Sequence, residues 1–164
     1  MKILTLVRHA KSSWDIDGLD DFDRPLNNRG LRDSVSMGER LLAGGCVPQH
    51  IVSSPALRAI TTAQRLSQTM QLSEQAISLE AAIYEASSDH LYDCIWALDE
   101  RYEDIMLVGH NPGMSVLAES LLTESIAPFV TCAMARLSFD CQGWSEIIPN
   151  SARLEFSDYP KSEQ

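Results

Sequence analysis

Short apolar segments alternate with amphipathic helical patterns along most of the chain, and this alternation limits the possible folds more than any other feature. The segments with the apolar character of buried strands are residues 2–8, 50–54, 76–80 and 104–110. Helical patterns follow them at residues 29–45, 54–70, 87–100 and 111–124. In the second helix we expect Ser54 as N-cap and Pro55 at the first helical position. Because parallel strands need long crossovers, this order predicts a three-layer α/β/α fold with a mostly parallel sheet.

The pattern changes after residue 130. The segments 134–140, 144–149 and 152–158 are short and apolar enough to be strands. We expect antiparallel pairing among them, with one antiparallel strand at the edge of the sheet. No repeat or linker interrupts the chain, so residues 1–157 are predicted to form a single domain. The polar residues 158–164 are predicted to be a flexible C-terminal tail.

The charge balance of the chain argues against several classes of partner. Its 164 residues carry a formal net charge of −10, which disfavours nucleic acid and anionic membranes. No apolar run approaches the roughly 20 residues that span a bilayer, and no signal-peptide pattern is visible. We therefore expect a cytoplasmic protein that is a monomer or a weak oligomer.

Basic side chains gather where three of the expected strands end. Arg8 and His9 close the first strand, Arg58 lies one turn into the helix after the second, and His110 ends the fourth. Parallel sheets bind ligands at the carboxyl ends of their strands, so these four residues are expected to converge. Such a group suits a phosphoryl anion, and no metal or cofactor is needed where arginines neutralise the charge.

One imidazole of this group could attack phosphorus and form a phosphohistidine intermediate. Its other ring nitrogen would then need an acceptor, often a backbone carbonyl, that holds the correct tautomer. The second histidine, if protonated, would add positive charge at a phosphoryl oxygen. Helix N-termini after His9 and after His110 would contribute backbone N–H groups.

Several motifs are similar to those of one known family. VRHAKS (7–12), RPLNNRG (24–30), SSPALRAITTA (53–63), LYD (91–93) and LVGHNPG (107–113) resemble the histidine phosphatase superfamily, above all its short SixA-type phosphohistidine phosphatases. The likeness extends over residues 1–157 and implies a phosphoglycerate mutase-like fold. It implies that His9 is the nucleophile and that Arg8, Arg58 and His110 form the phosphate pocket. It also implies that Arg24, Asn111 and Ser12 bind the substrate.

The chain departs from the larger members of this family at two positions. Asp15 stands where mutase-type relatives have an asparagine that touches phosphate, which argues against phosphoglycerate-type substrates. Ala81 falls near the place of their general acid, which leaves Glu85 as a candidate for that role. Arg24 also has a second interpretation, because it could pair with Asp21 or Asp23 instead of with a phosphate.

A site without a dedicated acid suits a phosphorus–nitrogen bond, because imidazole leaves more easily than an alkoxide. We therefore predict a metal-independent phosphatase of protein phosphohistidine, with a histidine phosphotransfer domain as a candidate partner in signal transduction. The alternatives are a small-molecule phosphomonoesterase of the same mechanism and a non-catalytic module that binds a phosphate or a phosphoprotein.

The acidic run 15–23 vaguely resembles a calcium-binding loop. An EF-hand needs glutamate at its twelfth position, which here is Leu26. We therefore interpret the run as a solvated loop, which could repel acidic ligands or meet a basic face on a protein partner. No connection is long enough for a lid domain, so the site is expected to be open to substrates.

Overall fold

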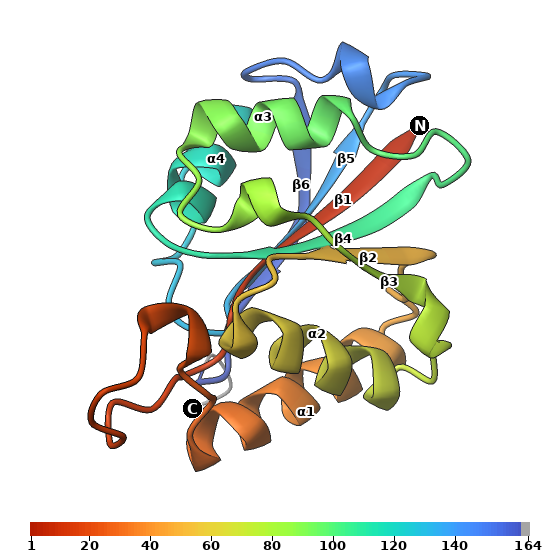
Figure 1. Ribbon diagram of the computed structural model, residues 1–164. Helices are drawn as coiled ribbons and strands as arrows, with labels where there is room; N and C mark the ends of the chain where they lie inside the picture. Colours follow the sequence, from red (N-terminus) through yellow and green to blue (C-terminus); the bar gives the residue numbers. More distant parts are fainter. Residues whose placement is uncertain (162–164) are drawn as a thin grey trace.

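A single six-stranded sheet runs through the middle of the computed structural model, which describes residues 1–161 (Figure 1). The strand order is β3-β2-β4-β1-β5-β6. The strands are β1 (Lys2–Arg8), β2 (His50–Ser53), β3 (Ile77–Leu79), β4 (Asp104–Gly109), β5 (Met134–Phe139) and β6 (Ala152–Asp158). The ladders among β1 to β4 are parallel, whereas β5 pairs antiparallel with both β1 and β6. The mostly parallel sheet with antiparallel pairing toward one edge is thus confirmed.

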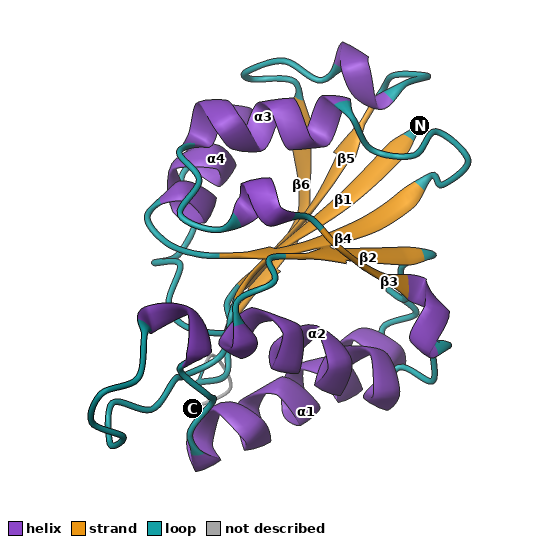
Figure 2. Cartoon of the chain, viewed as in Figure 1, coloured by secondary structure: helices purple, strands orange, loops and turns teal. Residues whose placement is uncertain are grey.

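Two pairs of helices cover the two faces of the sheet, which confirms the three-layer α/β/α architecture (Figure 2). The helices α1 (Asn28–Ala43) and α2 (Leu57–Thr69) lie on one face, and α3 (Ser88–Trp96) and α4 (Gly113–Leu121) lie on the other. Each face has its own apolar core. Leu41 and Leu66 pack with Met106 of the sheet on the first face, and Ile95 and Leu117 pack with neighbouring sheet residues on the second. Hydrophobic burial therefore holds the sheet on both sides.

A ligand crevice lies where the helices that follow two neighbouring strands pack on opposite faces of the sheet. β1 and β4 are neighbours, yet the chain leaves β1 toward α1 on one face and leaves β4 toward α4 on the other. The two connections diverge and leave the carboxyl ends of these strands uncovered between them. Parallel sheets bind ligands at such a switch point. The register aligns Arg8 with Gly109, so the residues that follow each strand emerge side by side.

Two local predictions were wrong. Residues 144–146 form the 3-10 helix η4 (Trp144–Glu146) instead of a strand. Trp144 and Ile147 are both buried and lie three residues apart, which is a helical rather than a strand spacing. The second helix begins at Leu57 with Ala56 as its N-cap, so Ser54 does not cap it and Pro55 precedes the helix instead of occupying its first position. The Ser54 hydroxyl instead accepts a hydrogen bond from the backbone N–H of Ala56 and contacts the crevice described below.

The end of the chain is tied to the first helix. Asp158 is the last residue of β6 and pairs with Arg40 of α1 at 3.0 Å, so it belongs to the sheet and not to a tail. Arg40 also donates to the backbone carbonyl groups of Tyr159 and Pro160. Of the predicted tail 158–164, residues 162–164 lie outside the described part of the chain. Within that part, no helix is both long and apolar enough to cross a membrane.

Gly30 offers a test of how α1 is seated beside the crevice. An added Cβ there would overlap the backbone carbonyl of Lys11, two residues after His9. We expect Gly30→Ala to lower the free energy of unfolding by about 1–3 kcal/mol, as overpacking against a rigid main chain does. The matched control is Gly44→Ala at the other end of α1, where φ is −82° and no atom is closer than 3.4 Å. Urea denaturation of both variants measures the difference, and equal stabilities would contradict this account of the packing.

Candidate active site

His9 follows β1 directly, and its hydrogen bonds determine its tautomer. The ring Nδ1 lies 2.8 Å from the backbone carbonyl oxygen of Ala10. A carbonyl can only accept, so Nδ1 carries the proton and the neutral ring has its lone pair on Nε2. Arg58 of α2 points its Nε at this lone pair from 3.4 Å. The backbone N–H of Ala10 donates in turn to the Thr62 hydroxyl of α2, which fixes the position of the accepting residue.

The surroundings of His9 keep this ring uncharged. Burial lowers the pKa of His9 to about 3, and His110 when protonated, together with the charged Arg58 and Arg8, acts in the same direction. His9 is only 7% exposed. At neutral pH the residue is therefore an unprotonated imidazole with an available Nε2, which is the form that can act as a nucleophile.

His110 faces His9 from the end of β4. Their ring centroids are 5.2 Å apart, and the Nε2 of His110 lies 2.7 Å from the Ser54 hydroxyl. The other ring nitrogen, Nδ1, is buried without a hydrogen-bond partner in the described chain. Burial, followed by the charge of Arg58, lowers the pKa of His110 to about 4. The unpartnered nitrogen marks a polar position at which a bound group could be satisfied.

Arg8 and Asn111 share one acceptor. Arg8 Nη1 donates to the backbone carbonyl of Phe129 at 3.2 Å, and the Asn111 side-chain amide donates to the same oxygen at 2.8 Å. The Asn111 carbonyl oxygen accepts from the backbone N–H of Ser115, so both of its polar atoms have protein partners. Arg8 Nε is buried without a partner in the described chain, and burial lowers the pKa of Arg8. Arg8 thus retains an unused donor beside the two histidines, whereas substrate binding by Asn111 remains a prediction.

Asp21 is the negative centre of the site. It belongs to the 3-10 helix η1 (Asp21–Asp23), and its carboxylate lies 2.9 Å from Arg58 Nη2 and 3.1 Å from Arg24 Nη2. The Tyr84 hydroxyl donates to it at 2.7 Å. The hydrogen bond from Tyr84, followed by those from the arginines, lowers the pKa of Asp21 to about 2. Burial and the Asp21 carboxylate raise the pKa of Tyr84 to about 12. Asp21 is therefore ionised and Tyr84 neutral at physiological pH.

Of the two interpretations of Arg24, the pair with Asp21 is observed, and the binding of substrate remains a prediction. Arg24 pairs with Asp21, and because Asp21 also binds Arg58, the same contact brings Arg24 into the cation group. Arg24 Nη1 donates to the hydroxyl of Ser12 at 2.7 Å, which places Ser12 next to it. Among the described residues Arg24 makes no ion pair with Asp23.

The remaining predicted residue, Glu85, lies on the rim of the site. It is exposed and lines a cavity of about 470 Å³ together with His110 and Asn111. Its role as a general acid stays a prediction. Three residues at the site were not identified from the sequence, namely Asp21, Ser54 and Tyr84. Asp21 was considered only as an alternative partner of Arg24, and the only signal for the others was their position in the motifs around strand ends.

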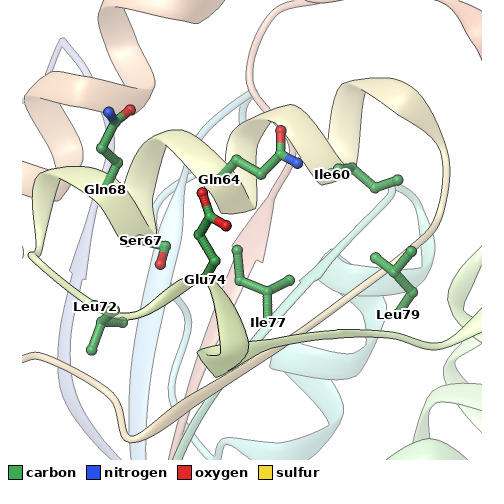
Figure 3. Close-up of a pocket in the computed structure, with 8 residues that line it drawn as sticks. All are labelled: Ile60, Gln64, Ser67, Gln68, Leu72, Glu74, Ile77 and Leu79. Carbon is green, nitrogen blue, oxygen red and sulfur yellow. The ribbon is translucent and has the colours of Figure 1, made fainter.

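Other features of the molecule do not contribute to this group. The cavity of about 750 Å³ between α2 and β3 is lined by Gln64, Ile77 and neighbouring residues, and it contains none of the predicted site residues (Figure 3). Throughout residues 1–161, no three His, Cys, Asp or Glu side chains are grouped so that they could hold a metal ion. The cationic crevice at the ends of β1 and β4 is therefore the candidate active site.

Comparison with known proteins agrees with this geometry. The model of the histidine phosphatase superfamily (branch 1) matches residues 4–88, which is 85 of the 164 residues and includes His9 and Arg58. The chain belongs to the histidine phosphatase superfamily. An uncharacterized chloroplastic protein of Arabidopsis thaliana is 32% identical over 151 residues, covering 87% of this chain and 69% of that protein.

Solved structures of SixA proteins share the whole fold of this superfamily member. SixA from Agrobacterium tumefaciens is 28% identical with a TM-score of 0.81, and the match covers 97% of this chain and 98% of that one. The protein histidine phosphatase SixA in complex with tungstate has a TM-score of 0.83 at 20% identity, with 99% of both chains covered. These likenesses confirm the SixA-type, phosphoglycerate mutase-like fold, and together with the superfamily they support phosphatase activity.

The lowered histidine pKa values predict how acid affects stability. The unfolded chain binds protons at its histidines below about pH 6.5, whereas His9 and His110 stay neutral in the folded protein until about pH 3 and 4. Above about pH 6.5 both histidines are neutral in both states, and their burial adds no pH dependence. As the pH falls from there toward 4, the unfolded chain binds protons that the folded protein does not, and the free energy of unfolding decreases. In urea unfolding between pH 6 and 4.5, the slope for His110→Gln should be shallower by up to about 1.4 kcal/mol per pH unit.

The control for this experiment is the exposed helical residue His90. The slope for His90→Gln is expected to match that of the unmodified protein. Equal slopes for the His110→Gln and unmodified chains would mean that His110 takes up its proton equally in both states, and the account of its burial would then be wrong.

Proposed function

We propose that this superfamily member is a metal-independent phosphatase of protein phosphohistidine that works through phospho-His9. The observation that carries the proposal is the bonding of the His9 ring. The backbone carbonyl of Ala10 accepts the Nδ1 proton, and the lone pair on Nε2 faces Arg58, whose Nε donates to it across 3.4 Å. A residue with a purely structural role would have no need of a buried, uncharged imidazole beside the charges of Arg58 and Arg8.

The first step of the proposed reaction transfers the phosphoryl group to the enzyme. The His9 Nε2 lone pair forms a bond to phosphorus while the bond from phosphorus to the substrate nitrogen breaks. The electron pair of the broken bond stays on the departing imidazole. That ring leaves as a neutral molecule when its other nitrogen already carries a proton. In this reaction Arg8, Arg58 and the nitrogen of His110 that has no partner within the described chain would donate to the phosphoryl oxygens, as the buried Arg8 Nε and His110 Nδ1 without partners suggest.

The second step releases the phosphate. Water attacks phospho-His9, the phosphorus–nitrogen bond breaks, and its electron pair returns to Nε2. Inorganic phosphate is the product, and the neutral ring is restored for the next turnover. The arginines balance the charge of the phosphoryl group in both steps, and this is why we propose that no metal is required.

The acid–base groups near His9 support a phosphorus–nitrogen bond as the substrate. Asp21 has a pKa of about 2 and cannot protonate a leaving group at neutral pH. Tyr84 has a pKa of about 12, and its hydroxyl proton is already donated to Asp21. An alkoxide leaving group would need a proton from such an acid, whereas an imidazole does not. SixA from A. tumefaciens is named, provisionally, as a phosphohistidine phosphatase, which fits the same substrate class.

Two experiments test the proposal: phosphate release from a phosphohistidine substrate, and replacement of the nucleophile His9. We expect the protein to release phosphate from a phosphohistidine-bearing phosphotransfer domain in the presence of EDTA. His9→Ala should lose several orders of magnitude in rate, because a covalent route has no substitute nucleophile. His90→Ala is the matched histidine control and should retain full activity. Rapid acid-free quenching of the unmodified protein should trap a phosphorylated chain that His9→Ala does not form.

Other outcomes would replace the proposal by one of its alternatives. Turnover of p-nitrophenyl phosphate alone would indicate a small-molecule phosphomonoesterase with the same nucleophile. Binding of phosphoprotein without turnover of either substrate would indicate a non-catalytic module. Loss of activity with EDTA and its recovery with a divalent cation would contradict metal independence.

Asp21 is expected to act as a positioning residue for Arg58. It holds Nη2 through its carboxylate and Nη1 through its backbone carbonyl, which leaves Nε directed at His9. With free phosphoramidate as the substrate, Asp21→Asn should lower kcat/KM by about tenfold or more, because misplaced catalytic groups are inefficient. Asp23→Asn changes the same charge on the same 3-10 helix and should leave this rate unchanged. Equal rates for the two variants would show that Arg58 keeps its position without the carboxylate.

A further inference from the structure

The loop 14–23, with the sequence WDIDGLDDFD, exposes an unusual set of side chains next to the crevice. All ten residues are exposed. Trp14, Ile16, Leu19 and Phe22 are 73%, 53%, 39% and 38% exposed, and they form a third of the twelve large apolar side chains exposed in residues 1–161. Single exposed apolar residues are common, but a group of them marks a contact surface.

The loop is anchored to the site at both of its ends. The Trp14 ring lies against the guanidinium of Arg24, with its centroid 3.5 Å from Cζ. Asp21 pairs with Arg58, and Phe22 packs edge-on against Tyr84 with ring centroids 5.1 Å apart. Between these anchors the loop projects from the body of the protein, as the dark red segment in Figure 1 shows. The two ends of the loop therefore border the crevice, through Trp14 at one end and Asp21 and Phe22 at the other.

The negative charges of the loop favour some ligands over others. Asp21 is neutralised by the arginines, whereas Asp15, Asp17, Asp20 and Asp23 make no ion pair within the described chain. The His110 Nδ1, on a residue more than nine-tenths buried and without a partner, indicates where a phosphoryl oxygen would be accepted. A free phosphate ester gains nothing from a negative rim around that position. A phosphate presented on a basic surface gains from it.

We propose that loop 14–23 is the docking surface for the phosphoprotein substrate, and that this substrate carries lysine or arginine and apolar side chains around its phosphorylated residue. The inference rests on the proposed function and adds the chemistry of the partner. A second copy of this chain does not fit the surface, because both copies carry a net charge of −10 and would repel each other. In this proposal the apolar residues of the loop contact apolar side chains of the partner, and the aspartates orient the partner through its lysine or arginine side chains.

Binding, measured apart from turnover, tests the surface directly. The probe is an in vitro phosphorylated histidine phosphotransfer domain whose phosphohistidine is flanked by lysines, titrated into the full chain carrying His9→Ala. Adding Asp15→Asn, Asp17→Asn and Asp20→Asn is expected to raise Kd about tenfold and to weaken its dependence on salt. Adding Ile16→Ser and Leu19→Ser should raise Kd as well. Within residues 1–161, none of these five side chains makes a hydrogen bond or ion pair with Arg24, Arg58 or Tyr84.

Matched controls separate docking from general effects of charge. Glu39→Gln, Glu74→Gln and Glu124→Gln remove three exposed carboxylates elsewhere and should leave Kd unchanged. Replacing the flanking lysines of the probe with glutamate should weaken binding to the parent chain but not to the aspartate variant. In the chain with native His9, the loop variants should reduce kcat/KM for the phosphoprotein and leave that for free phosphoramidate unaltered.

Each outcome decides one of the two proposals. An unchanged Kd in the loop variants, or no measurable binding by the parent chain, overturns the docking surface. Loss of activity on phosphoramidate in parallel with the phosphoprotein also overturns it, because the loop would then act on the catalytic group. Loop-dependent binding without phosphate release by the native-His9 chain keeps the docking surface and rejects the proposed phosphatase function.

Discussion

The parallel pairing of β1 with β4 is the contact on which the site depends. It aligns Arg8 with Gly109, so that His9 and His110 leave neighbouring strands at the same edge of the sheet. The crossovers diverge to opposite faces at this point and leave room for a ligand between the two rings. A shift of one residue in this register would turn the side chains of β1 to the opposite faces and separate the histidines. Packing of both sheet faces against helices makes such a shift costly, because each face has its own apolar core.

Several arginines lie near two buried imidazoles, and their charges would repel one another without compensation. One carboxylate offsets this repulsion, and both imidazoles stay neutral. Uncompensated buried cations repel one another, and each loses its hydration. Asp21 neutralises Arg58 and Arg24 from the solvent side, while the two histidines remain uncharged. The positive potential is thereby kept at Arg8 and at the inner edge of Arg58, where a phosphoryl group would bind. The same carboxylate gives the loop that carries it a defined position beside the crevice.

Sequence periodicity predicted the three layers and the mostly parallel sheet, because apolar periodicity indicates which face of an element is buried, but it did not predict the order of the strands in the sheet. It also predicted that Arg8, His9, Arg58 and His110 would meet, because parallel strands present their carboxyl ends on one edge. Periodicity failed at Trp144, where a tight turn buries the ring and an apolar run imitates a strand. Asp21 and Tyr84 could not be found in this way, because they reach the arginines from connections whose paths no local pattern specifies. The Ser54 hydroxyl was assigned to a helix cap, and only the three-dimensional path of β2 shows it beside His110.

Three of the four central side chains are oriented by the main chain. His9 donates to the carbonyl of Ala10, Arg8 to that of Phe129, and Arg58 to that of Asp21. Every amino acid presents the same carbonyl group, so the residues that supply these acceptors can be exchanged without removing them, provided that the backbone keeps its path. Substitutions around such a site can therefore change the surface that contacts a partner, while the positions of His9, Arg8 and Arg58 stay the same. An architecture of this kind allows new recognition to evolve on an old chemistry.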